Sequence, residues 1–175
     1  MSQIIGAVTA STRDYQIGWQ AGSSTSLLSI QETPDLGLST QGRADLDTSG
    51  IGSGQVISAA TLYWYNDSDS STAGKPGFDH RIRFVFSTEI YQSTVVESAG
   101  WNSQALTVGE FTEINTDNYT TFEFWVPDPG AGKSRAWGIR AWDYTDDDTW
   151  SIYLVVDYDP APDVVVRRGR AIVIG

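Results

Sequence analysis

Few side chains in this chain could support nucleophilic catalysis. The 175 residues include one histidine and no cysteine. A Ser–His–Asp set requires a base, and His80, between Asp79 and Arg81, is the single candidate. The Gly-x-Ser-x-Gly turn that exposes a catalytic serine in many hydrolases does not occur in the sequence. We therefore predict a structural or surface role for His80, and no enzymatic activity.

Paired carboxylates suggest a second chemistry, that of glycoside hydrolysis. Glycosidases hold two carboxyl groups about 5 to 10 Å apart across the scissile bond. Sequence spacing alone does not place any pair at that separation, so we expect solvated acids, no catalytic residues and no cofactor-binding site. The candidate pairs are Glu110 with Glu113, Glu123 with Asp157, and members of the acidic cluster at 143–148.

The acidic loops could instead bind a structural calcium ion. Ca²⁺ takes six to eight oxygen ligands from flexible segments. The best candidate ligands are Asp143, Asp146 and Asp148 in one loop and Asp67 with Asp69 in another, and Asp157 with Asp159 comes next. None of these acidic loops has the spacing of an EF-hand. Ordinary hydrated turns are the alternative.

The elements that would position these residues are short alternating strands. In the strongest, at 56–65, Ala60, Leu62 and Trp64 share one face, and Tyr63 and Tyr65 the other. Similar runs occur at 80–87, 120–126, 135–143 and 150–158, and no long segment has helical periodicity. The inward face is expected to carry Phe122, Phe124 and Val126 in the run at 120–126, and Ile152, Leu154 and Val156 in the run at 150–158. We predict a single all-β domain, an antiparallel β-sandwich of jelly-roll type over residues 1–162. Asn66 is expected to begin a long polar loop, and Trp101 to lie in a loop after Gly100.

Five aromatic residues fall on the polar phase of their strands: Tyr63, Tyr65, Trp125, Trp142 and Tyr153. Aromatic rings at such positions anchor protein interfaces or stack on sugars. A sandwich with partly covered outer faces would bury them instead. Burial, a subunit interface and a sugar platform all remain open from the sequence.

The last segment, 163–175, follows a spacer that contains Pro160 and Pro162. It is a β-prone run that carries Arg167, Arg168 and Arg170 on an otherwise acidic chain. Such an arm could add a strand to a neighbour's sheet and pair with its acidic surface. Alternatively, it is the last strand of its own sandwich.

The net charge of −11 narrows the range of partners. Phosphate backbones bind Lys and Arg, so neither nucleic acid nor an anionic membrane is an expected partner. No window approaches about 18 apolar residues, and the first residues lack a cationic stretch, so neither a membrane span nor a signal peptide is expected. Apolar residues near both ends, such as Ile4 and Ile174, predict that both ends pair as strands.

Several short motifs occur in a familiar order. A strand ends in Asp45-Leu46 or in Leu46-Asp47, Ile51 and Gly54 follow, and then comes a Ser-Ala-x-x-Leu-x-Trp-Tyr strand at 58–65. This order resembles the front of the jelly-roll modules named for a DNRLRE motif. Residues 151–160, Ser-Ile-Tyr-Leu-Val-Val-Asp-Tyr-Asp-Pro, are similar to the closing strand of those modules. The resemblance covers about residues 42–160, although the DNRLRE string itself is absent.

That resemblance implies a jelly roll of the kind found on secreted and surface proteins, where it resembles carbohydrate-binding domains, with related folds in virion proteins. We expect a non-enzymatic structural protein, a homo-oligomeric component of a phage virion surface such as a capsid decoration or tail protein. Its partners would be itself and other virion proteins. The alternative is an extracellular carbohydrate-binding module that uses Trp125, Trp142, Tyr63 and Tyr65, with a structural Ca²⁺ nearby.

Overall fold

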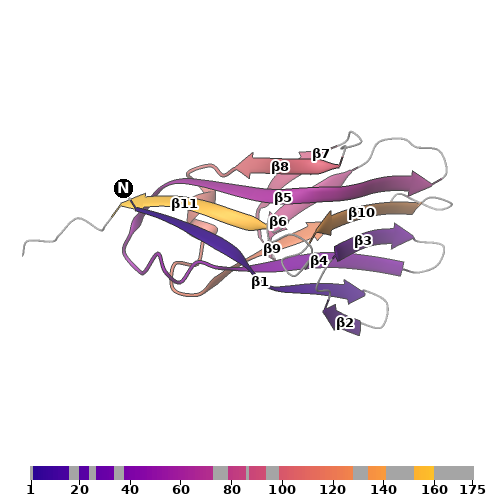
Figure 1. The fold of residues 1–175 in the computed structure, drawn as a ribbon, viewed down its shortest axis with the longest axis horizontal. Helices are drawn as coiled ribbons and strands as arrows, with labels where there is room; N and C mark the ends of the chain where they lie inside the picture. Colours follow the sequence, from indigo (N-terminus) through magenta and orange to yellow (C-terminus); the bar gives the residue numbers. More distant parts are fainter. Residues whose placement is uncertain are drawn as a thin grey trace, which may run out of the picture.

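The computed structural model describes nine ranges of the chain: 2–15, 20–23, 27–33, 38–72, 79–85, 87–93, 99–127, 134–140 and 152–159. Side chains are described at 42–66, 79–85, 87–93, 99–127, 137–139 and 152–159. These ranges contain eleven strands and one short 3₁₀ helix (Figure 1). None of the helical structure in them is long and apolar enough to span a membrane.

The strands range from 4 residues in β2 to 17 in β5, and every pairing between them is antiparallel. Their bounds are β1 Ser2–Tyr15, β2 Gln20–Ser23, β3 Leu27–Thr33, β4 Leu38–Asp47, β5 Val56–Thr72, β6 His80–Phe84, β7 Glu89–Ser93, β8 Gly100–Ala105, β9 Tyr119–Trp125, β10 Ser134–Arg140 and β11 Tyr153–Asp159. The 3₁₀ helix η2 spans Glu110–Glu113, between β8 and β9.

Two layers of strands form an antiparallel β-sandwich, as the alternating pattern predicts. The strands are hydrogen-bonded in the order β2-β1-β11-β5-β10-β3-β4-β9-β6-β7, with β8 also paired to β5, and the run β4-β9-β6-β7 forms one layer while β11, β5 and β8 form the other. Strands β10 and β3 connect the layers on one side. Strand β1 connects them on the other, because residues 2–7 pair with β11 and residues from Val8 onward pair with β4. A register shift between Val8 and Ala10 marks the point where β1 changes partner. Bulges of this kind bend a strand and let it pass from one layer to the other.

The core lies between these layers and is strongly aromatic. The apolar residues on one face of the central strands are buried, as in β9, where Phe122 and Phe124 are fully enclosed. Leu62 and Trp64 of β5 and Leu154 of β11 face them from the other layer and belong to the same cluster. The inward phases predicted for β5, β9 and β11 are therefore confirmed.

The prediction that a polar loop begins at Asn66 is wrong, because β5 continues through Asn66 to Thr72. Strand β10 pairs with this second half of β5, so its backbone groups are satisfied in a ladder despite a run of Asn, Asp and Ser. Trp101, expected in a loop, lies in β8 because that segment pairs with β5.

His80 is a core residue, which resolves the choice between a structural and a surface role. It is fully buried, and its ring stacks on that of Trp137 with centroids 4.7 Å apart. The indole Nε1 of Trp137 in turn donates a hydrogen bond to Oδ1 of Asn66. Asn66 is therefore the buried polar partner that accommodates a tryptophan inside the sandwich.

The apolar start of the chain is paired in β1, as predicted. Residues 163–175, predicted as an arm or last strand, lie outside the described residues.

Candidate functional site

Four aromatic side chains form a continuous surface on the outer face of the layer that contains β5, β8 and β11. These are Tyr63 and Tyr65 of β5, Trp101 of β8 and Tyr153 of β11, together called the aromatic surface below. Since Leu62 and Trp64 are buried in the core, the alternation of β5 directs Tyr63 and Tyr65 to the opposite side. The register places Tyr153 directly opposite Tyr63, and Trp101 directly opposite Tyr65.

The rings of the aromatic surface contact one another in sequence. Tyr63 and Tyr153 are stacked, with centroids 4.8 Å apart and planes inclined by 13°. Trp101 meets Tyr65 edge to face at 5.7 Å and 85°, and meets Tyr153 at 5.4 Å and 65°. Each geometry lies in the favourable range for aromatic pairs. The four rings therefore hold one another in place before any partner binds.

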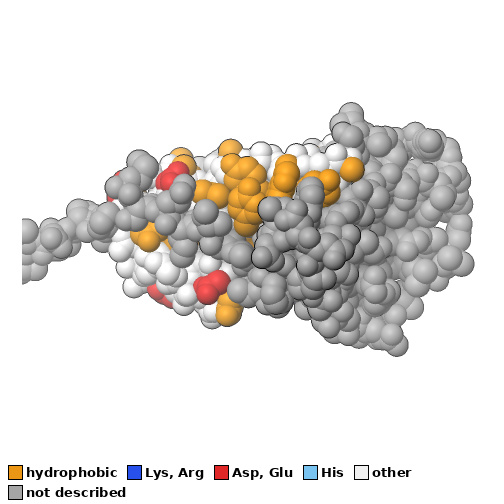
Figure 2. All heavy atoms as spheres, in the orientation of Figure 1, with side chains coloured by type: hydrophobic (Ala, Val, Ile, Leu, Met, Phe, Trp, Pro, Cys, Tyr) orange, Lys and Arg blue, Asp and Glu red, His pale blue; other side chains and the backbone are white. Residues whose placement is uncertain are grey.

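The aromatic surface is partly open to solvent. Trp101 retains 42% of its accessible area, and the three tyrosines are half-buried. In Figure 2 hydrophobic side chains gather over β5, β8 and β11 on the face that is shown. Partial burial raises the pKa of the Tyr153 hydroxyl, and the neighbouring Tyr63 raises it further. Deprotonation would place a phenolate in this apolar setting, which is unfavourable.

Among the side chains that the structure describes on β5, β8 and β11, the positions around the rings are uncharged. In the register of the three strands, the outward-facing neighbours are Thr61, Ser103, Ala105 and Val155. The first charged residue on this face of β11 is Asp157, which is opposite Ala59. A chain with a net charge of −11 therefore carries an uncharged aromatic patch on one outer face.

Three of the five aromatic residues singled out in the sequence, Tyr63, Tyr65 and Tyr153, thus lie together. Trp101 was missed because β8 gives almost no strand signal: its inward positions, Asn102 and Gln104, are polar. Its pairing with β5 makes it a strand. A tryptophan beside a glycine in an otherwise polar run was the one hint available.

Trp125 faces outward as predicted, but on the opposite side of the sandwich. Its strand neighbour Phe124 packs in the same core as Trp64, so the outward phases of β9 and β5 point away from each other. The guanidinium groups of Arg81 and Arg83 lie 5.2 and 5.0 Å from the Trp125 ring. This ring is thus already engaged in cation–π contacts and does not belong to the aromatic surface.

The candidate carboxylate pair of Glu123 and Asp157 is divided between the two layers of the sandwich. Glu123 is fully buried and ion-paired, with Oε1 3.4 Å from Nη2 of Arg43 and Oε2 2.5 Å from Nε of Arg83. Asp157 lies on β11, in the other layer. Glu110 accepts a hydrogen bond of 2.6 Å from the backbone N–H of Thr107, which ties it to the start of η2.

The remaining predicted residues lie outside the described residues, namely Trp142, Arg167, Arg168 and Arg170, and the proposed calcium ligands Asp143, Asp146 and Asp148. Among the residues that the structure describes, no three acidic or histidine side chains converge as metal ligands.

No protein-family model matches this sequence, and no curated protein is significantly similar to it. The likeness of residues 42–160 to DNRLRE-type modules therefore stays a prediction. Any proposal about function depends on the residues themselves.

Proposed function

We propose that this chain is a non-enzymatic structural protein that self-associates through its aromatic surface. The most economical setting is the surface of a phage virion, as a capsid decoration or tail protein. The observation that carries the proposal is the connected set of four rings at Tyr63, Tyr65, Trp101 and Tyr153 on an outer sheet face. Tryptophan and tyrosine are enriched among the residues that dominate binding energy at protein interfaces.

The ring geometry favours a protein partner over a sugar. A sugar platform needs ring faces that a pyranose can cover, whereas Tyr63 and Tyr153 cover each other's faces. The outward surface is therefore formed by ring edges that are already fixed in position, and Trp101 is the most exposed of the four residues. A rigid aromatic surface of this kind loses little conformational entropy when a complementary surface packs against it.

Charge supports the same proposal. Two copies that each carry −11 repel one another, so close approach favours a surface without acidic side chains. The outward positions that surround the rings are uncharged. Strong acidity also suits the outside of a nucleoprotein particle better than a surface that touches the genome.

The test is the solution mass of the full chain by light scattering over a concentration series. We expect a concentration-dependent oligomer, and at least a tenfold weaker association when Tyr65→Ala and Trp101→Ala are combined. Tyr119→Ala is the matched control, since Tyr119 is an aromatic residue of β9 with similar exposure, 47%, and is not part of the aromatic surface. The control should leave the mass unchanged.

A wild-type chain that remains monomeric at all concentrations would count against self-association. An oligomer that the double variant leaves intact would count against this surface as its contact. Circular dichroism of each variant separates loss of association from loss of fold.

Carbohydrate binding is a second candidate, and the exposure of Trp101 favours it. At 42% exposure, this indole can accept one sugar ring, with Ser103 nearby as a polar group. The chain would then be an extracellular monomer. Saturable binding on a glycan array that Trp101→Ala abolishes and Tyr119→Ala preserves would support this candidate over the first.

A further inference from the structure

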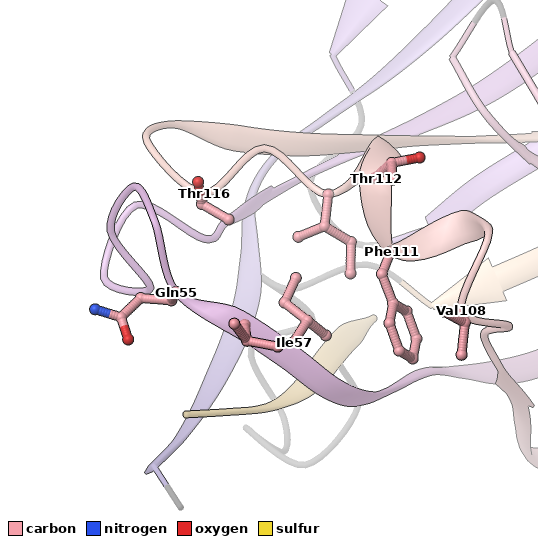
Figure 3. A pocket seen from close by; sticks show the side chains of 8 residues that line it. Gln55, Ile57, Val108, Phe111, Thr112 and Thr116 are labelled. Atoms are coloured by element: carbon pink, nitrogen blue, oxygen red, sulfur yellow. The ribbon is translucent and has the colours of Figure 1, made fainter. Parts of the chain in front are cut away.

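A second, separate surface feature is an apolar pocket at the end of the sandwich where β5 begins. Its volume is about 420 Å³, within the usual range for ligand pockets of about 300 to 1,000 Å³. Figure 3 shows Ile57 on one side and Phe111 and Val108 on the other. Val108 and Val56 keep 80% and 54% of their accessible areas, although both are aliphatic residues that line this pocket.

The walls of the pocket are tied together by hydrogen bonds. Thr48 Oγ1 donates to a backbone carbonyl oxygen of the 114–118 loop, that of Asn115 or Asn118, which lie 2.6 and 2.9 Å away. The backbone N–H of Gly52 donates to the carbonyl oxygen of Thr116 at 2.9 Å. These bonds tie the segment before β5 to the segment after η2. The pocket is therefore preformed, and binding there does not require its loops to be reordered.

The surroundings of the pocket are acidic. Its lining residues come from two stretches, 44–74 and 84–132, neither of which contains a lysine or arginine. Glu110 and Glu113 lie in η2 beside the lining residues Phe111 and Thr112, and Asp117 follows Thr116. An occupant that fits this site is apolar and carries positive charge.

One segment of this chain has that chemistry. Residues 164–174 contain three arginines, Arg167, Arg168 and Arg170, no acidic residue, and otherwise aliphatic residues and one glycine. The chain leaves β11 close to the pocket, since Asp159 at the end of that strand is paired with Val56, a lining residue.

We propose that the pocket receives residues 164–174 of a second copy of this chain. This inference rests on the proposed function and specifies a second contact for it. Aliphatic side chains of the segment fill the pocket against Val108 and Phe111, and the arginines pair with Glu113 and Asp117. The residue before each proline is restricted to extended conformations, so Pro160 and Pro162 favour a chain that continues away from β11 over one that turns back to Val56.

Such a contact is heterologous, since the segment of one copy meets the pocket of another. Repeated contacts of this type close into a ring or continue as a filament. The aromatic surface could be self-complementary across a two-fold axis, whereas the segment and pocket are two different surfaces. The two contacts can therefore be broken independently.

A charge-reversal series in the full chain tests the contact. One variant carries Arg167→Glu, Arg168→Glu and Arg170→Glu, and the other carries Glu113→Lys and Asp117→Lys. Each variant alone is expected to weaken self-association at least tenfold by light scattering. An equimolar mixture of the two should recover part of the lost association. The chain that combines both sets of substitutions should associate nearly as well as wild type. A combined variant no better than either single one would overturn the inference.

A binding assay separates failure of this inference from failure of the proposed function. A fluorescent peptide of residues 164–175 is titrated with the arginine-reversed full chain, whose own segment no longer competes. We expect saturable binding that Val108→Asp weakens at least tenfold and that Ser87→Asp, at an exposed turn outside the pocket, leaves unchanged. Absence of binding, or equal binding to both variants, overturns the pocket contact. In that case, light scattering of the variant that combines Tyr65→Ala and Trp101→Ala still tests whether the aromatic surface mediates self-association.

Discussion

Strand alternation directs side chains outward on both outer faces of the sandwich, but the two faces differ in character. On the layer of β5, β8 and β11, the outward side chains form the aromatic surface. On the layer of β4, β9 and β6 they form a charged face, consisting of Arg43, Arg81, Arg83, Glu123 and Trp125. Both faces contain aromatic residues, and they differ in how those residues are paired.

On the charged face, each group described here has a partner from a neighbouring strand. Glu123 lies between Arg43 and Arg83, and the guanidinium groups of Arg81 and Arg83 cover Trp125. Arg81 also bonds Asp79 at 2.9 Å and Glu89 at 3.2 Å, and the first of these contacts raises its pKa. Glu123 is fully buried although it is on the outward phase of its strand.

The four side chains of the aromatic surface carry no charge, and their rings contact one another. Its apolar area remains partly exposed, so it can gain free energy by packing against another molecule. An outward aromatic residue is therefore not by itself a binding residue. Trp125 contributes to stability, whereas we expect Trp101 to contribute mainly to association.

Glu123→Ala should have the largest effect on stability. It removes the buried carboxylate and leaves two guanidinium groups facing each other. Removal of one partner from a buried ion pair costs about 3–5 kcal/mol, and because Arg43 and Arg83 are 23% and 30% exposed we expect about 2–4 kcal/mol. Urea unfolding measures this loss, and Glu113→Ala, at an exposed position, should change the free energy of unfolding by less than about 0.5 kcal/mol.

Arg83→Met should have a smaller effect of the same sign. It removes one of the two ion pairs of Glu123 and one of the two cation–π contacts of Trp125, while a methionine keeps part of the packing. Arg43 still pairs with Glu123, so we expect a loss of about 1–2 kcal/mol in the free energy of unfolding. A loss as large as that of Glu123→Ala would show that Arg43 cannot compensate.

Trp101→Ala should cost about 1 kcal/mol or less, because the indole is already substantially exposed and loses mainly its two edge-to-face contacts. Association should nevertheless fall at least tenfold, which makes this variant the reverse of Glu123→Ala. Urea unfolding at low protein concentration, combined with light scattering, separates the two quantities. A stability loss above about 3 kcal/mol would place Trp101 in the core and contradict the contrast between the faces.

The ionisation of Tyr153 should produce the smallest effect. Its pKa is raised in the folded chain, so the unfolded chain loses this proton first as the pH rises. The stabilisation is thus complete below the ordinary tyrosine pKa of about 10 and is lost as the pH rises through the folded value. Absorbance titration near 295 nm should show a late-titrating tyrosine that Tyr153→Phe removes. If the late-titrating phase persists in the Tyr153→Phe variant, another tyrosine is responsible for it.

Much of the local structure was predictable. Alternation alone placed Leu62, Trp64, Phe122, Phe124 and Leu154 inward, because a strand has a period of two and one face must meet the core. Strand β8 and the second half of β5 were not predictable, since their inward or paired positions are polar and depend on a neighbouring strand for hydrogen bonds. Secondary structure that is specified by pairing leaves little trace in one segment's own residues.

The sequence by itself determined the fold class, the outward phase of Tyr63, Tyr65, Trp125 and Tyr153, and the acidity of the chain. Only the tertiary structure decided which of these residues meet. It brought Tyr63 and Tyr153 into contact across β5 and β11, added Trp101 from β8, and placed Trp125 on the other face beneath two arginines. The physical reason is that alternation specifies only the side of a strand on which a residue lies, whereas strand order and register specify its neighbours.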